Sequence, residues 1–477
     1  MKKADPNPKA NRSILFLTYM VLAVLVGMMA YFGYFLQVES EDVINNPYNK
    51  RLERFSDRIF RGSILSADGQ VLAETVLGEE GEELRVYPFG NLFAHVVGHS
   101  SKGKTGLEAQ GDFYLLTSHV NLLEQIFDQL SDRKDPGDDL VTTLDVGLQQ
   151  VAYAALGDRK GAVVALEPGT GKILAMVSKP DYDPNPFSLD GAWEGLLSED
   201  NDQAQLLNRA TQGLYPPGSV FKIVTMLEAM REDPAGYGDE PFTCSGVFTQ
   251  DDYSIRCYQG TVHGQQDLGL AFANSCNGAF AKLGLGLDLD AMHGLAEQLL
   301  FNGELPLPMA YSKSSYQMEA GADEWEILQT AIGQGRTQVT PMHVAMITAA
   351  IANGGVLMEP YLMDHVQDQA GEEVKKFLPK AYGSLMTAEE SAGLNALMVR
   401  VVTEGTGSAL RDAPYQAAGK TGSAEFRRDR ETHAWFTGYA PADAPKIVVT
   451  VVVEEGGSGG RSAAPIARAM FDHYLSR

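Results

Sequence analysis

The chain has 477 residues, of which 44% are apolar and 21% charged, so it is long enough for two or three globular domains. Its net charge of −24 argues against nucleic acid as a partner, because the phosphate backbone is bound by basic surfaces. Three cysteines are too few for a disulfide scaffold.

The N-terminus has the pattern of a membrane anchor. Residues 1–12 carry four basic side chains against one acid, and residues 13–38 carry no charge. The uncharged segment exceeds the ~20 residues that span a bilayer, so we predict one transmembrane helix at 13–38. A cleaved signal peptide is the alternative, but its apolar core would be shorter and no Ala-x-Ala site follows. Because basic flanks stay inside, we expect 1–12 to be a cytoplasmic tail and the remainder to lie outside the plasma membrane.

Residues 39–143 form a predicted first external region. The stretch 61–73 is typical of a hairpin turned at Asp68-Gly69, and 119–129 has helical periodicity. Residues 132–139, which include a Pro-Gly pair, are typical of a linker. No catalytic constellation is present in this region, so we expect it to be a membrane-proximal structural domain.

Residues 144–477 form a second predicted region with strands at both ends and helices between them, which indicates an α/β (α+β) fold with one sheet closed by both ends of the region. A Thr-Pro pair caps one helix, and Thr387 with Glu390 forms a capping box for another. The expected strands are 161–166, 172–178, 420–426, 433–439 and 447–453, and the expected helices include 219–230, the pair within 267–284, 340–352 and 465–474.

The serine at position 219 opens an apolar helix directly after Tyr215-Pro216-Pro217-Gly218. Ser219 and Lys222 are three residues apart and therefore share a helix face. Lys222 is the only charge in this run before Glu228, and burial lowers the pKa of an amine. A neutral amine beside a hydroxyl at a helix N-terminus is a nucleophile with its base. The spacing Ser-x-x-Lys also occurs at Ser101/Lys104 and Ser131/Lys134, but both copies lie in polar surroundings and open no apolar helix.

Two further short motifs follow in the chain. Ser275-Cys276-Asn277 lies within the helical pair, and Lys420-Thr421-Gly422-Ser423 begins a predicted strand. Each motif alone is weak: the first could merely cap a helix break, and the second is an ordinary strand start. A second Lys-Thr-Gly at Lys104 precedes the serine helix and has no strand after it.

The ordered set of three motifs resembles that of penicillin-binding transpeptidases. The Tyr-Pro-Pro-Gly stretch, Gly333-Gln334-Gly335, the hairpin at Arg61-Gly62 and the single anchor make the chain similar to class B penicillin-binding proteins, over nearly its whole length. The compact region 39–143 resembles the pedestal or dimerisation domain of the shorter members, and no glycosyltransferase domain is present. The resemblance implies the penicillin-binding transpeptidase/serine β-lactamase fold, an antiparallel sheet flanked by helices.

The resemblance also implies roles in cell-wall synthesis. Ser219 would attack the penultimate carbonyl of a peptidoglycan stem peptide ending in D-Ala-D-Ala, Lys222 would take its proton, and Ser275 would relay a proton to the leaving nitrogen. Asn277 would hold the substrate amide, and Lys420 would supply positive potential. Expected binding residues are Thr421 for the terminal carboxylate, Gly422 for close approach of the strand edge, and Ser423 for an oxyanion hole completed by the Ser219 N–H.

We expect no cofactor and no metal, because no His/Cys/Asp spacing resembles a metal site. His263 and His433 are interpreted as surface or strand residues, and Cys276 as a small buried filler. Cys244 and Cys257 flank a polar loop, and outside the cytoplasm they form either a disulfide, which we predict, or two separate thiols.

Two other functions stay open. A serine β-lactamase uses the same nucleophile, but the Glu-x-x-Leu-Asn pattern of class A enzymes is absent and the anchor argues against it. The chain could instead serve mainly as a structural activator of a SEDS-type membrane glycan polymerase, the partner with which class B relatives work. β-Lactams are the expected acylating ligands.

Overall fold

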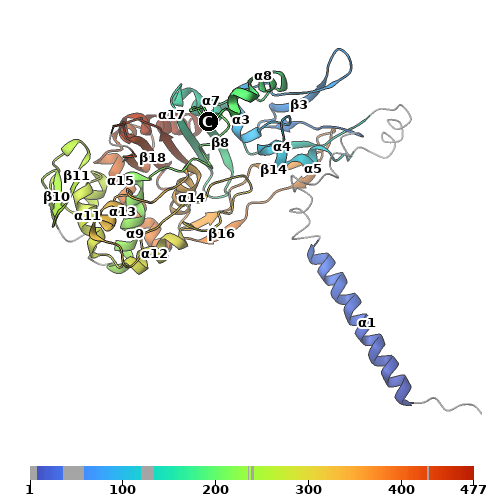
Figure 1. Cartoon of the computed structure of the whole chain (residues 1–477), viewed down its shortest axis with the longest axis horizontal. Helices are drawn as coiled ribbons and strands as arrows, with labels where there is room; N and C mark the ends of the chain where they lie inside the picture. Colours follow the sequence, from blue (N-terminus) through green and yellow to red (C-terminus); the bar gives the residue numbers. More distant parts are fainter. Residues whose placement is uncertain (1–7, 36–57, 120–133, 235, 238–240, 427–428) are drawn as a thin grey trace, which may run out of the picture.

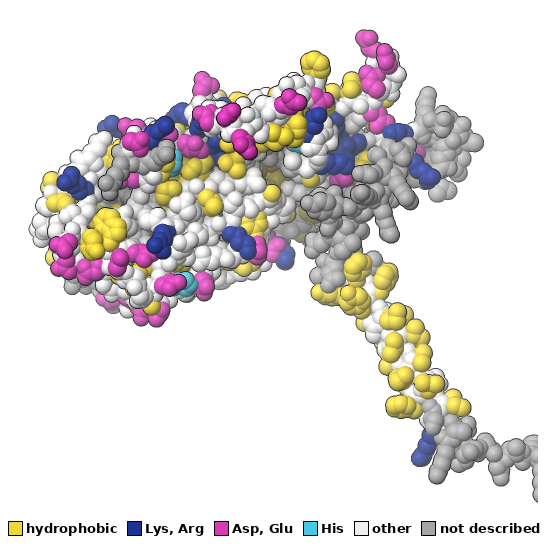
Figure 2. Space-filling model, in the orientation of Figure 1, with side chains coloured by type: hydrophobic (Ala, Val, Ile, Leu, Met, Phe, Trp, Pro, Cys, Tyr) yellow, Lys and Arg dark blue, Asp and Glu magenta, His cyan; other side chains and the backbone are white. Residues whose placement is uncertain are grey.

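A computed structural model describes residues 8–35, 58–119, 134–234, 236–237, 241–426 and 429–477. Its first element is α1 (Pro8–Tyr34), a single long helix whose segment Ile14–Tyr34 is long and apolar enough to cross a membrane. The apolar side chains of this helix are exposed along its length (Figure 2). The predicted anchor is therefore one continuous helix as far as Tyr34, and its last residues lie outside the described part of the chain.

A five-stranded sheet forms the centre of the larger part of the molecule. Its strands are all antiparallel to their neighbours, and the first and last parts of the region both contribute to it. The order is β17 (Ala418–Ala424), β18 (His433–Ala440), β19 (Ile447–Val453), β7 (Gly161–Leu166) and β8 (Ile173–Lys179). The predicted sheet closed by both ends of the region is confirmed, and β17 lies at its edge.

Helices cover both faces of this sheet. On one face lie α7 (Val146–Leu156) and α17 (Ala464–Leu475), whose apolar side chains share a core with alternate residues of the strands. On the other face lies α14 (Pro341–Ala352), capped by the Thr340 side chain as expected. Because both faces are covered, the central strands are apolar at successive positions instead of alternating.

The membrane-proximal part contains a second sheet of six strands, seen on the right of Figure 1. The expected hairpin turns at Asp68-Gly69 between β2 and β3. In spatial order the strands are β15 (Glu373–Lys376), β14 (Met363–Gln367), β6 (Asp139–Thr142), β2 (Ile64–Leu65), β3 (Val71–Leu77) and β4 (Glu83–Val86). Two of them, β14 and β15, come from beyond residue 144, so the two predicted regions share a sheet.

The predicted linker at 132–139 is wrong in its described part. Residues Asp135–Pro136 form β5, which pairs in parallel with β1 (Ile59–Phe60), and β6 begins at Asp139. Backbone hydrogen bonds attach this stretch to neighbouring segments, so its Pro-Gly pair belongs to ordered, paired structure and not to a linker. The helix predicted at 119–129 falls almost wholly outside the described residues.

A buried ion cluster fixes α4 (Gly106–Gln110) to this sheet. Glu108 accepts from Arg85 Nε at 2.7 Å and from Arg61 Nη2 at 2.6 Å, and its side chain is fully buried. Burial alone would raise the pKa of Glu108, but Arg85 and Arg61 outweigh it and lower the pKa to about 2. The second Lys-Thr-Gly copy lies beside this cluster, where Lys104 pairs with Asp112 at 2.6 Å, so it is a structural feature far from the serine helix in the chain.

The remaining elements connect the two sheets or cover the site. Thr387 and Glu390 make the predicted capping box at the start of α15. The helices among these elements are α3 (Ala94–Val97), α5 (Asp112–Leu115), α8 (Pro186–Leu197), α12 (Leu289–Gln298), α13 (Glu324–Ala331), α15 (Ala388–Thr403) and α16 (Gly459–Ser462). Two short 3-10 turns, η3 (Gly90–Phe93) and η6 (Ser408–Leu410), and the paired strands β13 (Val356–Met358) and β16 (Ala381–Ser384) complete them.

Candidate active site

Ser219 lies on a tight turn that enters a buried helix. The turn is η4 (Gly218–Phe221), a 3-10 helix followed directly by α9 (Lys222–Glu232). Gly218 has φ +53° and donates its N–H to the Gly333 carbonyl at 2.8 Å. A Cβ on Gly333 would lie 2.0 Å from the Gly218 carbonyl oxygen, so only glycine fits there. The Gly333-Gln-Gly335 stretch therefore supports the serine turn from behind.

Lys222 is completely buried at the start of α9. Every residue from Lys222 to Met230 is buried, as the apolar pattern predicts. Its ammonium donates to the Ser275 carbonyl at 2.8 Å and to Asn277 Oδ1 at 2.8 Å, with a longer contact of 3.4 Å to Ser275 Oγ. These hydrogen bonds connect the first motif to the second. Among the described residues, Lys222 makes no hydrogen bond to the Ser219 hydroxyl in this ligand-free arrangement. Catalytic hydrogen bonds often tighten only when substrate binds.

The second motif lies where α10 (Leu268–Ala273) gives way to α11 (Asn277–Gly286). Ser275 has φ +57°, a backbone conformation uncommon for a side chain with a Cβ. The break turns its hydroxyl toward the interior, where Lys420 Nζ donates to Ser275 Oγ at 2.9 Å. Ser275 Oγ thus lies between the two buried lysines.

Burial controls the protonation of both lysines. Loss of water lowers the pKa of Lys222 to about 7, although the nearby sulfurs of Cys276 and Cys257 act to raise it. Burial, with the charge of Lys222 added, lowers the pKa of Lys420 well below its usual value. Near neutral pH the site therefore holds a serine hydroxyl, an amine that can accept a proton, and a second hydroxyl that bridges two amines.

The third motif forms the edge strand β17. Thr421 Oγ1 lies 2.5 Å from Thr406 Oγ1, and Lys420 Nζ also donates to the Thr421 carbonyl at 3.0 Å. A Cβ at Gly422 would come within 3.1 Å of Trp435 Cβ and 3.2 Å of Val220 Cγ1. Glycine at this position therefore lets the serine turn and the next strand pack closely against β17. Its expected part in admitting the substrate stays a prediction.

One cleft unites these groups. It has a volume of about 940 Å³. Six of the eight predicted site residues line it, and Lys222 and Lys420 lie buried beneath its floor. The lining residues are Ser219, Ser275, Asn277, Thr421, Gly422 and Ser423.

Sequence reasoning missed two supports of the site. Thr406 contacts the Thr421 hydroxyl and lines the cleft, and its only sequence signal is its position between Gly405 and Gly407. The Arg256 carbonyl accepts from Asn277 Nδ2 at 2.8 Å, a backbone contact for which no sequence signal exists. Both come from segments far from the motifs that they support.

The predicted Cys244–Cys257 disulfide is absent. Their Sγ atoms are 3.6 Å apart, well beyond the ~2.05 Å of an S–S bond, and both thiols are free. Cys276, interpreted as a filler, contacts Cys257 Sγ at 3.8 Å, and Cys244 Sγ lies 3.3 Å from His263 Nδ1. The loop between Cys244 and Cys257 therefore brings these residues into a larger cluster.

Comparison with known proteins identifies two matched domains. Residues 161–472 match the penicillin binding protein transpeptidase domain, and residues 61–140 match the penicillin binding protein A dimerisation domain. The chain is 36% identical to the peptidoglycan D,D-transpeptidase PbpA of Mycolicibacterium smegmatis, over 89% of this chain and 91% of that protein.

Solved structures give the same picture. A ceftriaxone acyl-enzyme complex of penicillin-binding protein A from M. tuberculosis superposes with a TM-score of 0.79 at 33% identity, covering 89% of this chain and 100% of that one. PBP2 of Pseudomonas aeruginosa superposes with a TM-score of 0.73 at 29% identity, covering 88% of this chain and 97% of that one.

Proposed function

The chain belongs to the penicillin-binding protein transpeptidase family, and from this premise we propose that it is a serine-type peptidoglycan D,D-transpeptidase that cross-links stem peptides. The observation that carries the proposal is the convergence of three separate motifs on one cleft, with two buried lysines on either side of Ser275 Oγ. A hydroxyl, an amine of lowered pKa and a bridging hydroxyl are the groups that acyl transfer needs.

In the acylation step, the Ser219 oxygen attacks the carbonyl of the penultimate D-alanine. Lys222 accepts the hydroxyl proton, and the C–N bond to the terminal D-alanine breaks. Ser275 Oγ, which accepts from Lys420, gives its proton to the leaving nitrogen, which departs as D-alanine, and takes in return the proton held by Lys222. An amine of a second stem peptide then attacks the ester, so a new amide forms and Ser219 recovers its proton.

Substrate binding follows from the edge position of β17. An extended peptide can lie along a free strand edge, where main-chain groups supply affinity. Thr421 would bind the terminal carboxylate, Asn277 the substrate amide, and the N–H groups of Ser219 and Ser423 the oxyanion. Each oxyanion donor is typically worth ~3–4 kcal/mol of transition-state stabilisation. Gly422 serves this edge indirectly, by letting the serine turn pack against it.

The proposed organisation places residues 1–12 in the cytoplasm, 13–38 in the plasma membrane, 39–143 in a membrane-proximal domain and 144–477 in an extracytoplasmic transpeptidase domain. The long apolar helix α1 supports the anchor, and the basic N-terminal flank supports the orientation. A SEDS-type glycan polymerase is the membrane partner that the family resemblance implies. A Ser219→Ala chain that still sustains glycan polymerisation would separate that role from catalysis.

Labelling with a fluorescent penicillin tests the activity. The full-length protein in detergent should gain one drug mass, which maps to the peptide containing Ser219 and decays slowly, and Ser219→Ala should not label. Ser458→Ala is the matched control, because Ser458 lines the same cleft and should leave labelling intact. Rapid release of penicilloic acid with little covalent protein would identify a β-lactamase instead, and a label on another serine would refute the assignment of Ser219.

A further inference from the structure

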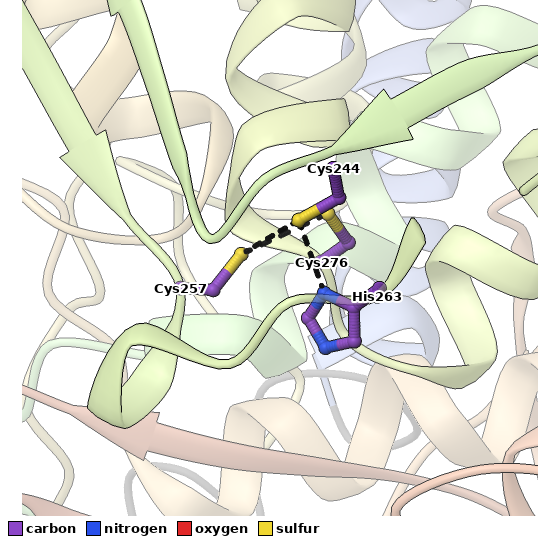
Figure 3. A group of neighbouring side chains, drawn as sticks. All are labelled: Cys244, Cys257, His263 and Cys276. Atoms are coloured by element: carbon purple, nitrogen blue, oxygen red, sulfur yellow. Dashed lines mark hydrogen bonds between the residues drawn. The ribbon is translucent and has the colours of Figure 1, made fainter. Parts of the chain in front are cut away.

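Three thiols and one imidazole meet beside the active site. Cys244, Cys257, His263 and Cys276 place one sulfur or ring-nitrogen atom each within 4.8 Å of all the others. Figure 3 shows the four side chains converging from separate segments of the fold. The cluster uses every cysteine of the chain, and all three thiols are buried. Packing of small apolar residues does not by itself require three thiols and an imidazole to meet at one point.

The distances fit a tetrahedral ion. Zinc–sulfur bonds of ~2.3 Å at tetrahedral angles separate neighbouring sulfurs by about 3.8 Å, and sulfur from nitrogen by about 3.6 Å. The observed separations are 3.6 Å between Cys244 and Cys257, 3.8 Å between Cys257 and Cys276, and 3.3 Å between Cys244 Sγ and His263 Nδ1. Three of the six separations therefore lie close to those of a tetrahedral ion, and the other three are no longer than 4.8 Å.

The backbone holds the ligands in place. Strand β9 (Phe242–Cys244) pairs with β12 (Gly264–Gln266), which sets His263 next to Cys244. Gly246, at φ +90°, directs its N–H to Cys244 Sγ at 3.4 Å, and its carbonyl accepts from the Cys257 N–H at 3.0 Å. Cys257 ends the hairpin of β10 (Val247–Gln250) and β11 (Tyr253–Arg256), at the turn η5 (Tyr258–Gly260).

The fourth ligand comes from a different part of the fold. Cys276 is the N-cap of α11, where the helix dipole favours a thiolate. The sequence spacing, with 12 residues between Cys244 and Cys257, five before His263 and 12 before Cys276, contains no close Cys-x-x-Cys pair. No local spacing of a metal site is therefore present in the sequence, and the expectation of no metal did not consider this group.

We propose that Cys244, Cys257, His263 and Cys276 form a Cys₃His site that binds one zinc ion. Thiolate and imidazole ligands in tetrahedral arrangement select zinc over calcium and magnesium, which prefer oxygen. Four protein ligands close the coordination shell, so the ion is structural and takes no part in the reaction. Binding displaces protons from the thiols and ties together the four segments that carry the ligands.

The position of the site gives the ion a second role, which rests on the proposed function. Cys276 stands between Ser275 and Asn277 in the chain, and Cys257 follows Arg256, whose carbonyl accepts from Asn277 Nδ2 at 2.8 Å. An ion held by these two cysteines would therefore fix both the backbone of the second motif and the acceptor that orients its amide. Zinc thus positions Ser275 and Asn277 against the lysines.

Metal content tests the site directly. Full-length protein, purified in detergent without chelators, should carry about one zinc per chain by elemental mass spectrometry. Cobalt exchanged into the protein should give the thiolate-to-cobalt charge-transfer band and the intense visible bands of tetrahedral coordination. Cys244→Ala and His263→Ala should lose most of the metal, whereas Ser245→Ala, an exposed neighbour on the same loop, should keep it.

A rescue variant separates coordination from packing. His263→Cys offers a fourth thiolate, which zinc accepts, so this variant should keep the metal that His263→Ala loses. Full-length protein with less than one tenth of an ion per chain and no uptake from micromolar zinc would overturn the site. A Cys244–Cys257 disulfide found by mass spectrometry of unreduced, alkylated protein would overturn it equally.

Penicillin labelling tests the positioning role. Removal of the ion by a zinc chelator should slow acylation of Ser219 at least tenfold, and added zinc should restore the rate. A zinc-loaded protein whose acylation rate is the same after chelation would refute the positioning role and leave the site itself standing. Labelling that is absent even in the zinc-loaded wild type would instead refute the proposed function, so the two failures are distinguishable.

Discussion

Replacing Lys222 with methionine removes the proposed base and a buried amine at once, with little change in side-chain length. The pKa of this lysine is about 7 in the folded chain against an ordinary value of 10.5. At ~1.36 kcal/mol per pKa unit, burying the protonated amine costs up to ~5 kcal/mol of folding free energy. Burial is the cause, because the amine has no exposed surface and no carboxylate within the described contacts.

The sign of this cost depends on pH. Between pH 7 and 10.5 the unfolded chain binds more protons at this position than the folded chain, so stability rises with pH. The cost is ~4 kcal/mol at pH 7 and ~2 kcal/mol at pH 9. The substitution also removes the two hydrogen bonds that Lys222 donates to the Ser275 carbonyl and to Asn277 Oδ1, each worth ~1 kcal/mol of stability. Lys222→Met should therefore be ~2 kcal/mol more stable than wild type at pH 7 and about equal to it at pH 9.

Activity should change in the opposite direction. Loss of a general base slows acylation by penicillin at least ~100-fold. In the wild type the rate should fall about tenfold per pH unit below pH 7, as Lys222 becomes protonated. The assays are stopped-flow acylation between pH 5 and 9, and denaturant unfolding followed by tryptophan fluorescence, to which Trp435, buried in the central sheet, contributes.

Lys446→Met is the control, because Lys446 is exposed and should change neither quantity. A Lys222→Met protein that is less stable than wild type at pH 7, or a stability difference that does not vary with pH, would refute the desolvation argument. Wild-type acylation rates in this variant would show that another group deprotonates Ser219.

Three further predictions follow from other parts of the molecule. Gly333→Ala should unfold at a temperature lower by several degrees and should acylate slowly, because the new Cβ would lie 2.0 Å from the Gly218 carbonyl oxygen. Gly191→Ala is the calorimetric control, because Gly191 lies inside a helix and a Cβ there would have no neighbour within 4 Å. Glu108→Gln should destabilise the membrane-proximal domain by ~3–5 kcal/mol, since it leaves the buried Arg85 without its carboxylate and Arg61 with Asp112 alone. The difference from wild type should vanish in unfolding titrations as pH falls toward 2, where Glu108 itself protonates. Protease added to intact spheroplasts should digest the bulk of the chain, because the proposed single span at 13–38, with its basic flank inside, would place that bulk outside. Full protection would reverse the orientation.

The sequence determined the features that depend on local order. A charge-free run predicts the anchor, and the alternation of apolar strands with capped helices predicts the central sheet and the helices on it. The three motifs could be recognised in the sequence because each places particular residue types at a short, fixed spacing. These are Ser219 with Lys222, Ser275 with Asn277, and Lys420 with the strand that follows it.

Only the tertiary structure decided which distant groups meet. The sharing of the membrane-proximal sheet with β14 and β15 depends on backbone pairing across more than 200 residues, which leaves no local signature. The role of Gly422 depends on Val220 and Trp435, which approach it from two other elements. The cluster of Cys244, Cys257, His263 and Cys276 depends on the pairing of β9 with β12 and on the start of α11. Hydrophobic periodicity specifies the elements of a fold, whereas side-chain chemistry between elements arises only when packing brings their ends together.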